Sequence, residues 1–222
     1  MSNIIIDGVE VIISDIDQYL QINDISGSDL AKIWVKIKAD YASYEKWLCY
    51  RNYNEIPFAL LDEIGAVLED DCIETHLFAD NFICSEVFRV TRVTEESLDE
   101  FVAYHAKCNP ENGARCKIIK RNFPQWGIFT LMTDNQITDY VIISMKNPVQ
   151  AEIFCVEASD STKCRDLITS AAKYAFDNGK KDILYMADEN TLTHQAALSV
   201  GFVNTGFYKG YEIKGAGLLC TQ

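Results

Sequence analysis

The sequence has few of the residues that build metal centres and none of the long apolar runs that cross membranes. It contains only three histidines in 222 residues, and none of its eight cysteines forms a C-x-x-C pair. The closely spaced ligands of a structural zinc site are therefore missing. No stretch of 18 apolar residues occurs, and the N-terminal residues lack the basic and apolar regions of a secretory signal. We therefore expect reduced thiols, no metal and a cytoplasmic location.

Positive charge is also scarce. The chain has 20 Lys and Arg residues against 33 Asp and Glu residues, and its formal net charge is −13. A chain of this charge repels phosphate backbones and anionic lipids, so we expect neither nucleic acid nor a membrane as partner. The charge could favour a cationic substrate such as an amine, although acidity that serves solubility is the simpler interpretation.

Residues 1–86 are predicted to form an accessory segment that is rich in helix. Short β-type runs on either side of Asp7 and Gly8 predict a hairpin. Apolar and aromatic residues recur every three or four positions from Leu30 to Leu48, which predicts an amphipathic helix whose aromatic side chains belong to the core. A proline precedes a second predicted helix over residues 58–68.

From residue 87 the apolar patterns alternate between strands and helices. They predict strands over 87–93, 127–132, 140–145, 151–158, 182–187, 202–207 and 210–213, and helices over 98–105, 114–123, 161–178 and 190–200. The step from strand 151–158 through a helix to strand 182–187 predicts a parallel, right-handed crossover. The fold class is therefore α/β (α+β), with a mixed, mostly antiparallel sheet flanked by helices. No internal repeat is visible.

The end of this order resembles the GNAT superfamily of N-acetyltransferases. The resemblance is carried by Asn190, by the run Ala197-Leu-Ser-Val-Gly201-Phe202 and by Gly206-Phe207-Tyr208, at the family's spacing. It covers about residues 87–215 and implies a GNAT-like acetyltransferase domain over residues 87–222. It also implies acetyl-CoA as co-substrate, lying between strands 151–158 and 182–187, and an amine of a small molecule or a protein as acceptor.

The resemblance implies that backbone groups bind most of the co-substrate. Phe154, Cys155 and Val156 would pair with the pantetheine arm, and Asn190 matches a position near that arm. The pyrophosphate would lie on the amides of the next helix start, formed by Ser159, Asp160, Ser161, Thr162, Lys163 and Cys164. A helix start binds an anion through its unpaired N–H groups and its positive dipole end.

The sequence departs from the family pattern in this loop and on the last helix. Thr162 and Cys164 replace glycines that let the backbone approach phosphate, and the carboxylate of Asp160 repels a pyrophosphate. Lys163 supplies positive charge, and an ordinary capped helix without phosphate is the alternative. The family's general-acid tyrosine is replaced by Ala197. Cys164 lies in a first helical turn, where a thiol pKa can fall, and is a candidate oxidation site.

The reaction implied by the resemblance is direct attack of a neutral amine on the acetyl thioester. Glu152 is the preferred base, on the premise that strand alternation places Glu157 on the opposite face. Tyr208 and His194 are the candidate acids. The competing hypothesis is a non-catalytic GNAT-like module that binds acyl-CoA or a protein partner.

Two interpretations of residues 1–86 stay open. The segment is either an appended helical domain, which shapes the acceptor site or mediates self-association into a homodimer, or a degenerate half of a tandem arrangement. Neither the acceptor nor the oligomeric state follows from the sequence, because specificity in such folds lies in loops.

Overall fold

The computed structural model describes residues 2–16, 18–51, 56–85, 89–109 and 113–213. The chain divides into two compact units: unit 1 consists of residues 1–73 and 206–222, and unit 2 of residues 74–205. Within the described ranges, no helix is long and apolar enough to cross a membrane, and no three His, Cys, Asp or Glu side chains are placed to bind a metal. Two strands contain residues of both units, so the units do not coincide with the predicted division at residue 86.

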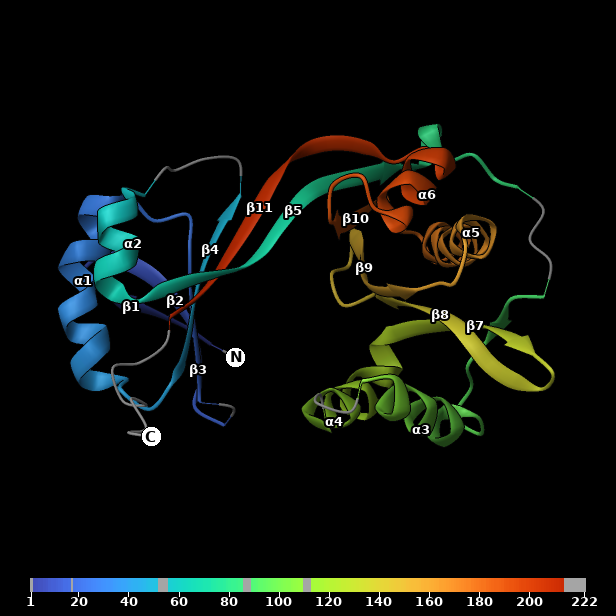
Figure 1. Ribbon diagram of the computed structural model, residues 1–222, viewed down its shortest axis with the longest axis horizontal. Coiled ribbons are helices and arrows are strands. Elements are labelled where there is room, and N and C mark those ends of the chain that lie inside the picture. The colour runs from blue at the N-terminus through green and yellow to red at the C-terminus, as the bar shows by residue number, and fades with distance from the viewer. Residues whose placement is uncertain (1, 17, 52–55, 86–88, 110–112, 214–222) are drawn as a thin grey trace. The chain divides into compact units, whose positions relative to one another are not determined.

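Unit 1 is a six-stranded sheet with two helices on one face. Its elements are β1 (Ser2–Ile6), β2 (Val9–Ser14), β3 (Tyr19–Asn23), α1 (Gly27–Asp40), β4 (Glu45–Arg51), α2 (Phe58–Ile64), β5 (Ala66–Phe78) and β11 (Val203–Ile213). The strand order is β1-β2-β3-β4-β11-β5 (Figure 1). Strands β3 and β4 are parallel and joined by α1, whereas β1/β2, β2/β3 and β4/β11 are antiparallel.

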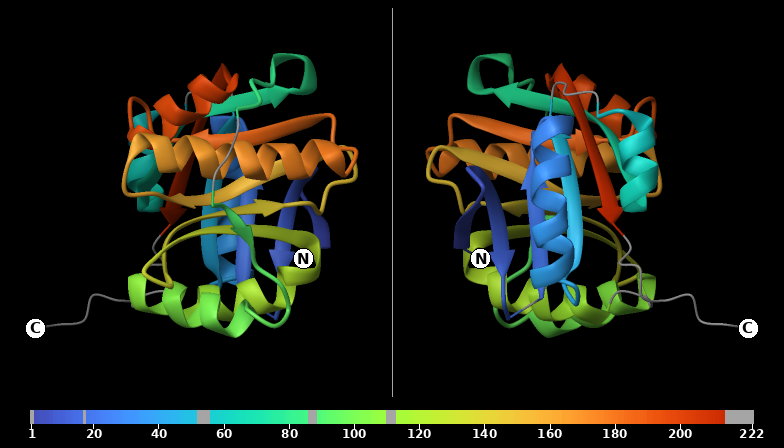
Figure 2. Two further views of the ribbon diagram at one scale, coloured as in Figure 1. Left: turned by 90° about the vertical axis from the view of Figure 1, so that its right-hand side faces the viewer. Right: turned by 90° about the vertical axis from the view of Figure 1, so that its left-hand side faces the viewer.

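Local sequence chemistry explains the first elements of unit 1. The predicted hairpin is present, with Asp7 and Gly8 at positive φ between β1 and β2. Helix α1 begins after Ser26, whose Oγ accepts a hydrogen bond from the Asp29 amide at 3.1 Å. Leu30, Ile33 and Ile37 of α1 are fully buried in one core with residues of β2, β3 and β4, and Figure 2 (right) shows the helix running alongside these strands.

Residues 1–86 carry more strand than the helical pattern predicts. Helix α1 ends at Asp40, and Leu48, which matches the helical spacing, instead lies on β4 with Tyr50 on the same buried face. Helix α2 ends at Ile64, because Gly65 adopts φ +71° and reverses the chain into β5. Helical spacing alone therefore extended both predicted helices into strands.

Unit 2 is a second mixed sheet with helices on both faces. It adds β6 (Thr91–Arg92), α3 (Leu98–Cys108), α4 (Gly113–Asn122), β7 (Trp126–Thr133), β8 (Gln136–Ser144), β9 (Gln150–Glu157), α5 (Ser161–Asp177), β10 (Asp182–Ala187) and α6 (Leu192–Val200). The strand order is β6-β7-β8-β9-β10-β5-β11. Strands β9 and β10 are parallel, and β6 to β9 are antiparallel neighbours.

The two faces of the unit 2 sheet carry separate cores. Along β7, Ile128 packs with α3 and α4 while Phe129 packs with α5. Along β8, Ile142 packs with α3 and α4 while Val141 packs with α5. This alternation is the period of two that a strand buried on both faces requires. Figures 1 and 2 show the sheet between α5 and the pair α3/α4.

The predicted fold class is confirmed, with six helices in the described ranges around mixed, mostly antiparallel strands. Two predicted elements differ. The last two strands are one strand, β11, because Gly210 is extended there and makes room for the Asp70 side chain. The predicted strand 87–93 is reduced to β6, and its residues 87 and 88 lie outside the described ranges.

Candidate functional site

The parallel strands β9 and β10 pair over only part of their length. The paired residues run from Asp182 opposite Gln150 to Tyr185 opposite Ile153. Strand β9 nevertheless continues to Glu157 and β10 to Ala187. Beyond Ile153 and Tyr185 the two strands do not pair with each other. Backbone N–H and C=O groups at their ends are therefore not used in a ladder between β9 and β10. The resemblance implies that the co-substrate lies between these two strands.

A β-bulge lies where β9 leaves β10. Cys155 is opposite Ile142 on β8, and Ile153 is opposite Ile143, so Phe154 is an extra residue with no partner on β8. Ile153 packs with α5, whereas Cys155 packs on the α3/α4 face. The bulge therefore breaks the alternation of side chains along β9.

The bulge corrects the sequence-based placement of the two glutamates. Glu152 is opposite Ser144 and Glu157 is opposite Tyr140, and both partners lie on the α3/α4 face of β8. Glu152 and Glu157 therefore share one face instead of lying on opposite faces. Regular alternation predicts opposite faces, but the extra residue Phe154 shifts the side chains that follow it to the other face of β9.

The three predicted pantetheine residues lie at this bulge. Phe154 is 49% exposed, and its ring lies 5.1 Å from the ring of Trp126, centroid to centroid. Cys155 is half-buried, with its Sγ 3.9 Å from the Tyr140 hydroxyl. Val156 packs against the α5-face core. All three thus lie on the part of β9 that has left β10.

The start of α5 follows β9 directly. Asp160 is the N-cap, and its Oδ1 accepts a hydrogen bond from the Lys163 amide at 2.9 Å. The Cys164 amide bonds to the Asp160 carbonyl at 3.0 Å, as in any helix. In the part of the chain that the structure describes, the amides of Ser161 and Thr162 have no hydrogen-bond partner. Both residues are exposed, so two amides of this helix start face solvent.

A buried carboxylate fixes the rest of the loop. Asp139 on β8 is fully buried and accepts hydrogen bonds from the Ser159 amide at 2.6 Å, the Thr138 hydroxyl at 2.6 Å and the Lys163 ammonium at 3.1 Å. Burial by itself would raise the pKa of Asp139, but these hydrogen bonds outweigh it and hold the pKa below its ordinary value. The amide of Ser159 and the charge of Lys163 are thus already engaged within the protein.

The structure corrects the expectation for Cys164. Its side chain is fully buried in the α5-face core, and burial, with smaller contributions from Asp160 and Asp139, raises the pKa of the thiol to about 12. Helix-start chemistry lowers a thiol pKa only where the thiol is solvated. Cys164 therefore packs as a small apolar residue and is no candidate for oxidation.

His194 lies inside unit 2 with both ring nitrogens bonded. Nδ1 accepts the Asn190 amide at 3.2 Å, and Nε2 lies 2.9 Å from the Asn204 side-chain oxygen. Asn190 itself adopts φ +62° in the turn before α6, and its side chain is exposed. Ala197, on the same helix, is fully buried in the α5-face core.

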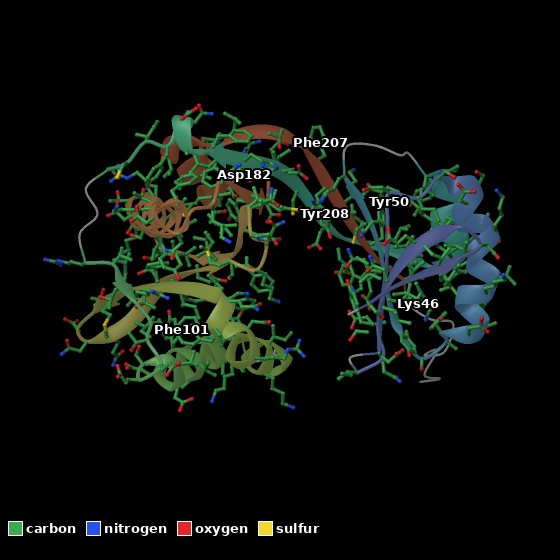
Figure 3. The ribbon with its side chains drawn as sticks, turned by 180° about the vertical axis from the view of Figure 1, so that it is seen from behind. Lys46, Tyr50, Phe101, Asp182, Phe207 and Tyr208 are labelled. Carbon is green, nitrogen blue, oxygen red and sulfur yellow. The ribbon has the colours of Figure 1, made fainter. Side chains whose placement is uncertain are left out.

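Tyr208 lies on β11 (Figure 3), within residues 206–222 that belong to unit 1. Its hydroxyl donates a hydrogen bond to the Cys49 sulfur on β4 at 3.2 Å. Burial, followed by this hydrogen bond, raises the pKa of Tyr208 far above its ordinary value. Glu152 and His194, the other two candidates, belong to unit 2.

Sequence reasoning missed a buried polar group behind the bulge. The Tyr140 hydroxyl lies 2.8 Å from His105 Nδ1, and both side chains are buried between β8 and α3. The predicted strand 140–145 includes Tyr140 only as part of an apolar run and begins after Asp139. An acid directly before a buried strand was the available signal, because a buried carboxylate requires partners.

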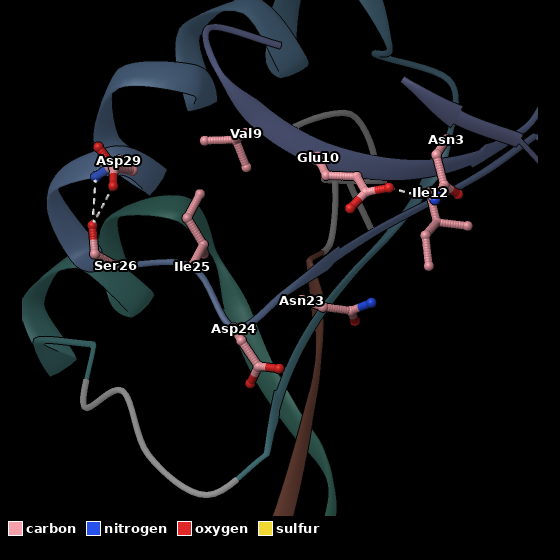
Figure 4. Close-up of a pocket in the computed structure, with 9 residues that line it drawn as sticks. All are labelled: Asn3, Val9, Glu10, Ile12, Asn23, Asp24, Ile25, Ser26 and Asp29. Carbon is pink, nitrogen blue, oxygen red and sulfur yellow. Dashed lines mark hydrogen bonds between the residues drawn. The ribbon is translucent and has the colours of Figure 1, made fainter. Parts of the chain in front are cut away.

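A separate pocket of about 310 Å³ lies in unit 1, at the start of α1 (Figure 4). Its charged lining side chains are Glu10, Asp24 and Asp29, all of them acidic. Asp29 also pairs with Lys32 at 2.9 Å. This pocket favours no anionic ligand, because the lining repels negative charge.

Comparison with known proteins identifies the fold. No protein-family model and no curated protein matches the sequence. Among solved structures, a GCN5-related N-acetyltransferase from Kribbella flavida is similar over 98% of this chain and 91% of its own, at 12% identity and a TM-score of 0.68. A GCN5-related N-acetyltransferase from Sphaerobacter thermophilus is similar over 92% and 76%, at 10% identity and a TM-score of 0.65.

A functionally unknown conserved protein from Staphylococcus epidermidis ATCC 12228 is also similar, over 89% of this chain and 84% of its own, at 14% identity and a TM-score of 0.63. These likenesses extend well beyond residues 87–215, the part in which the sequence resembles the superfamily.

Proposed function

We infer that this chain, which has the GNAT fold, binds acetyl-CoA in unit 2 between β9 and β10 and transfers the acetyl group to an amine. The observation that carries this proposal is the parting of the two parallel strands beside an open helix start. A likeness of fold alone does not establish an activity, because one scaffold supports many functions. The proposal therefore depends on the groups that line the opening.

The pantetheine arm and the pyrophosphate of acetyl-CoA have complementary groups at the opening. The amide-rich pantetheine arm can pair with the backbone of Phe154 to Val156, which no longer pairs with β10. The pyrophosphate can take the open amides of Ser161 and Thr162, supported by the helix dipole. Lys163 adds little, because Asp139 already holds its ammonium group.

Chemistry would take place on the α3/α4 face of the bulge. The amine loses a proton to Glu152, its nitrogen forms a bond to the thioester carbon, and the carbon–sulfur bond breaks. A backbone amide at Cys155 or Val156 would donate to the developing oxyanion. The proton taken from the amine returns to the CoA thiolate through solvent. His194 is not assigned as acid, because both of its nitrogens are bonded, and Tyr208 is not assigned because it belongs to unit 1.

Two measurements on the full chain test this function. A ligand at about 100 times its Kd stabilises the native state by about 2.7 kcal/mol, so saturating acetyl-CoA is expected to raise Tm by roughly 5–10 °C. Release of CoA thiol with a panel of amines then measures transfer. The proposal fails if acetyl-CoA leaves Tm unchanged.

A non-catalytic acyl-CoA-binding module is the second candidate. One observation favours it: Ala197 is buried where the family has its general acid, so binding without catalysis fits this helix. A rise in Tm without thiol release above the hydrolysis rate for any amine of the panel would select this candidate.

A further inference from the structure

The two units repeat one order of elements. In unit 1 the order is β1, β2, β3, α1, β4, α2, β5, and in unit 2 it is β7, β8, β9, α5, β10, α6, β11. In each, three strands pair as antiparallel neighbours, and a helix crosses over to a fourth strand that is parallel to the third. A second helix then leads to the last strand.

The strand order within each unit repeats as well. In unit 1 the order beyond the fourth strand is β4-β11-β5, and in unit 2 it is β10-β5-β11. In unit 1 the strand beside β4 is β11, which is the last strand of the unit 2 repeat. In unit 2 the strand beside β10 is β5, which is the last strand of the unit 1 repeat. Unit 1 therefore repeats the GNAT-like arrangement that unit 2 shows from β7 to β11.

The copies differ where unit 2 opens. In unit 1 all five residues of β3 pair with β4, ending with Asn23 opposite Cys49, and the helix cap Ser26 follows three residues later. In unit 2 the last paired residue is Ile153, and the helix cap Asp160 follows seven residues later. The extra residues of unit 2 are the arm of β9 that pairs with β8 but not with β10, together with its bulge. Unit 1 has no such arm.

Asp24 closes the corresponding place in unit 1. Its amide donates to the Cys49 carbonyl at 2.9 Å, and its Oδ1 accepts the Arg51 amide at 2.7 Å. These bonds join the chain after β3 to the end of β4. The backbone groups that would meet a pantetheine arm are thus already used within unit 1.

The helix start in unit 1 also disfavours a pyrophosphate. The Ser26 hydroxyl accepts the Asp29 amide and donates to the Asp29 carboxylate. Glu10, Asp24 and Asp29 line the pocket at this helix start (Figure 4). Negative side chains at a helix start compete with an anion for the same positive end of the dipole.

We propose that unit 1 is a sealed copy of unit 2 and that each chain binds one acyl-CoA, in unit 2 only. This inference rests on the proposed function, because it counts the sites of that ligand. It assigns to unit 1 no acyl-CoA chemistry of its own.

Calorimetric titration of the full chain with acetyl-CoA tests the proposal through its stoichiometry. Two matched variants place the site: Thr162→Asp in α5 and Ser28→Asp in α1. Both residues are exposed and occupy the second position after a helix cap, where an aspartate supports the helix. Far-UV circular dichroism and Tm verify that each variant is folded.

The expected result is one site per chain, weakened at least about tenfold by Thr162→Asp and changed less than about twofold by Ser28→Asp. Two sites per chain would overturn this inference and leave the transferase proposal standing. One site lost in Ser28→Asp and kept in Thr162→Asp would overturn both, because it would place the ligand in unit 1. If the unaltered chain binds no acetyl-CoA, both the proposed function and the inference of one acyl-CoA site per chain are overturned.

Discussion

Asp139 shows how much one buried side chain can determine. It is fully buried, carries three hydrogen bonds and connects β8 to the loop before α5. Because two of these bonds go to Ser159 in the loop and to Lys163 in the first turn of α5, the carboxylate acts on the shape of the loop and not only on its charge.

We expect Asp139→Asn to lower the free energy of unfolding by about 1–3 kcal/mol at neutral pH, because an amide cannot replace a charged acceptor of three donors. The folded-state pKa of Asp139 lies below its ordinary value. Its stabilisation is therefore complete above about pH 4 and lost as pH falls through the folded-state pKa. Urea unfolding from pH 7 to pH 3 is expected to show a smaller acid loss in the variant.

Asp160→Asn serves as its control, because asparagine also caps a helix well and residue 160 is exposed. Its expected change is within about 0.5 kcal/mol. Equal acid dependence in Asp139→Asn and the unaltered protein would contradict the role given to the Asp139 carboxylate.

The two glutamates of β9 give a second prediction at this scale. If Glu152 is the base, Glu152→Gln is expected to lower kcat/KM for the amine about a hundredfold or more, while Glu157→Gln lowers it less than about tenfold. Both residues lie on one face of the strand, so they form a matched pair. Thiol-release kinetics with unchanged acetyl-CoA affinity measure the effect. The reverse ranking would move the role of base to Glu157.

At the scale of elements, two helices of unit 2 end at glycines with positive φ but in different surroundings. Gly201 has φ +107°, and a Cβ there would lie 2.0 Å from the Asn81 carbonyl oxygen. Gly179 has φ +79°, and a Cβ there would meet no atom within 4 Å. The first glycine is thus required by both conformation and space, and the second by conformation alone.

We expect Gly179→Ala to cost about 1 kcal/mol of stability and Gly201→Ala to cost clearly more, about 2–4 kcal/mol, because backbone must move in the second case. Thermal or urea unfolding of the two variants measures the difference. Equal losses would mean that the segment at Asn81 yields without cost.

The sequence predicts some elements of the fold accurately and misses others. Strand β10 and helix α5 were predicted almost to the residue, because each has a complete apolar period and a clear start or end signal. Strand β5 was missed, because Glu69, Asp70 and Asp71 interrupt its apolar pattern and its ladder forms with β11, far away in sequence.

The candidate site was predicted in part for a related reason. Phe154, Cys155 and Val156 were placed on the correct strand, because strand and helix lengths fix that position. The faces of Glu152 and Glu157 were not, because a bulge depends on pairing with β8. The repeat of unit 1 in unit 2 lies in the pairing of strands, which a single sequence does not display.

At the scale of the whole molecule, the fragment 87–222 that the sequence predicts as a domain lacks part of unit 2. Residues 74–78 contribute Leu77, fully buried in the α5-face core, and Thr75, whose hydroxyl donates to the Tyr185 carbonyl at 2.8 Å. We expect this fragment to show no cooperative unfolding transition. Circular dichroism and urea titration of the purified fragment measure this.

If the fragment is insoluble, a single substitution in the full chain tests the contribution of β5 to unit 2. Leu77→Ala is expected to cost about 2–5 kcal/mol, as large-to-small changes in packed cores do. A fragment 87–222 that unfolds cooperatively, or a Leu77→Ala cost below about 1 kcal/mol, would show that strand β5 is dispensable for unit 2.

The placement of β11 beside β4 has a consequence for synthesis on the ribosome. Arg51 pairs with Tyr208, so the sheet of unit 1 gains its inner strand only after residues 206–213 have been made. Until then β4 presents a bare edge, which is a template for mispairing with other nascent chains. The part of the protein that is translated first thus reaches its native pairing last, and this closure over most of the chain length slows its folding.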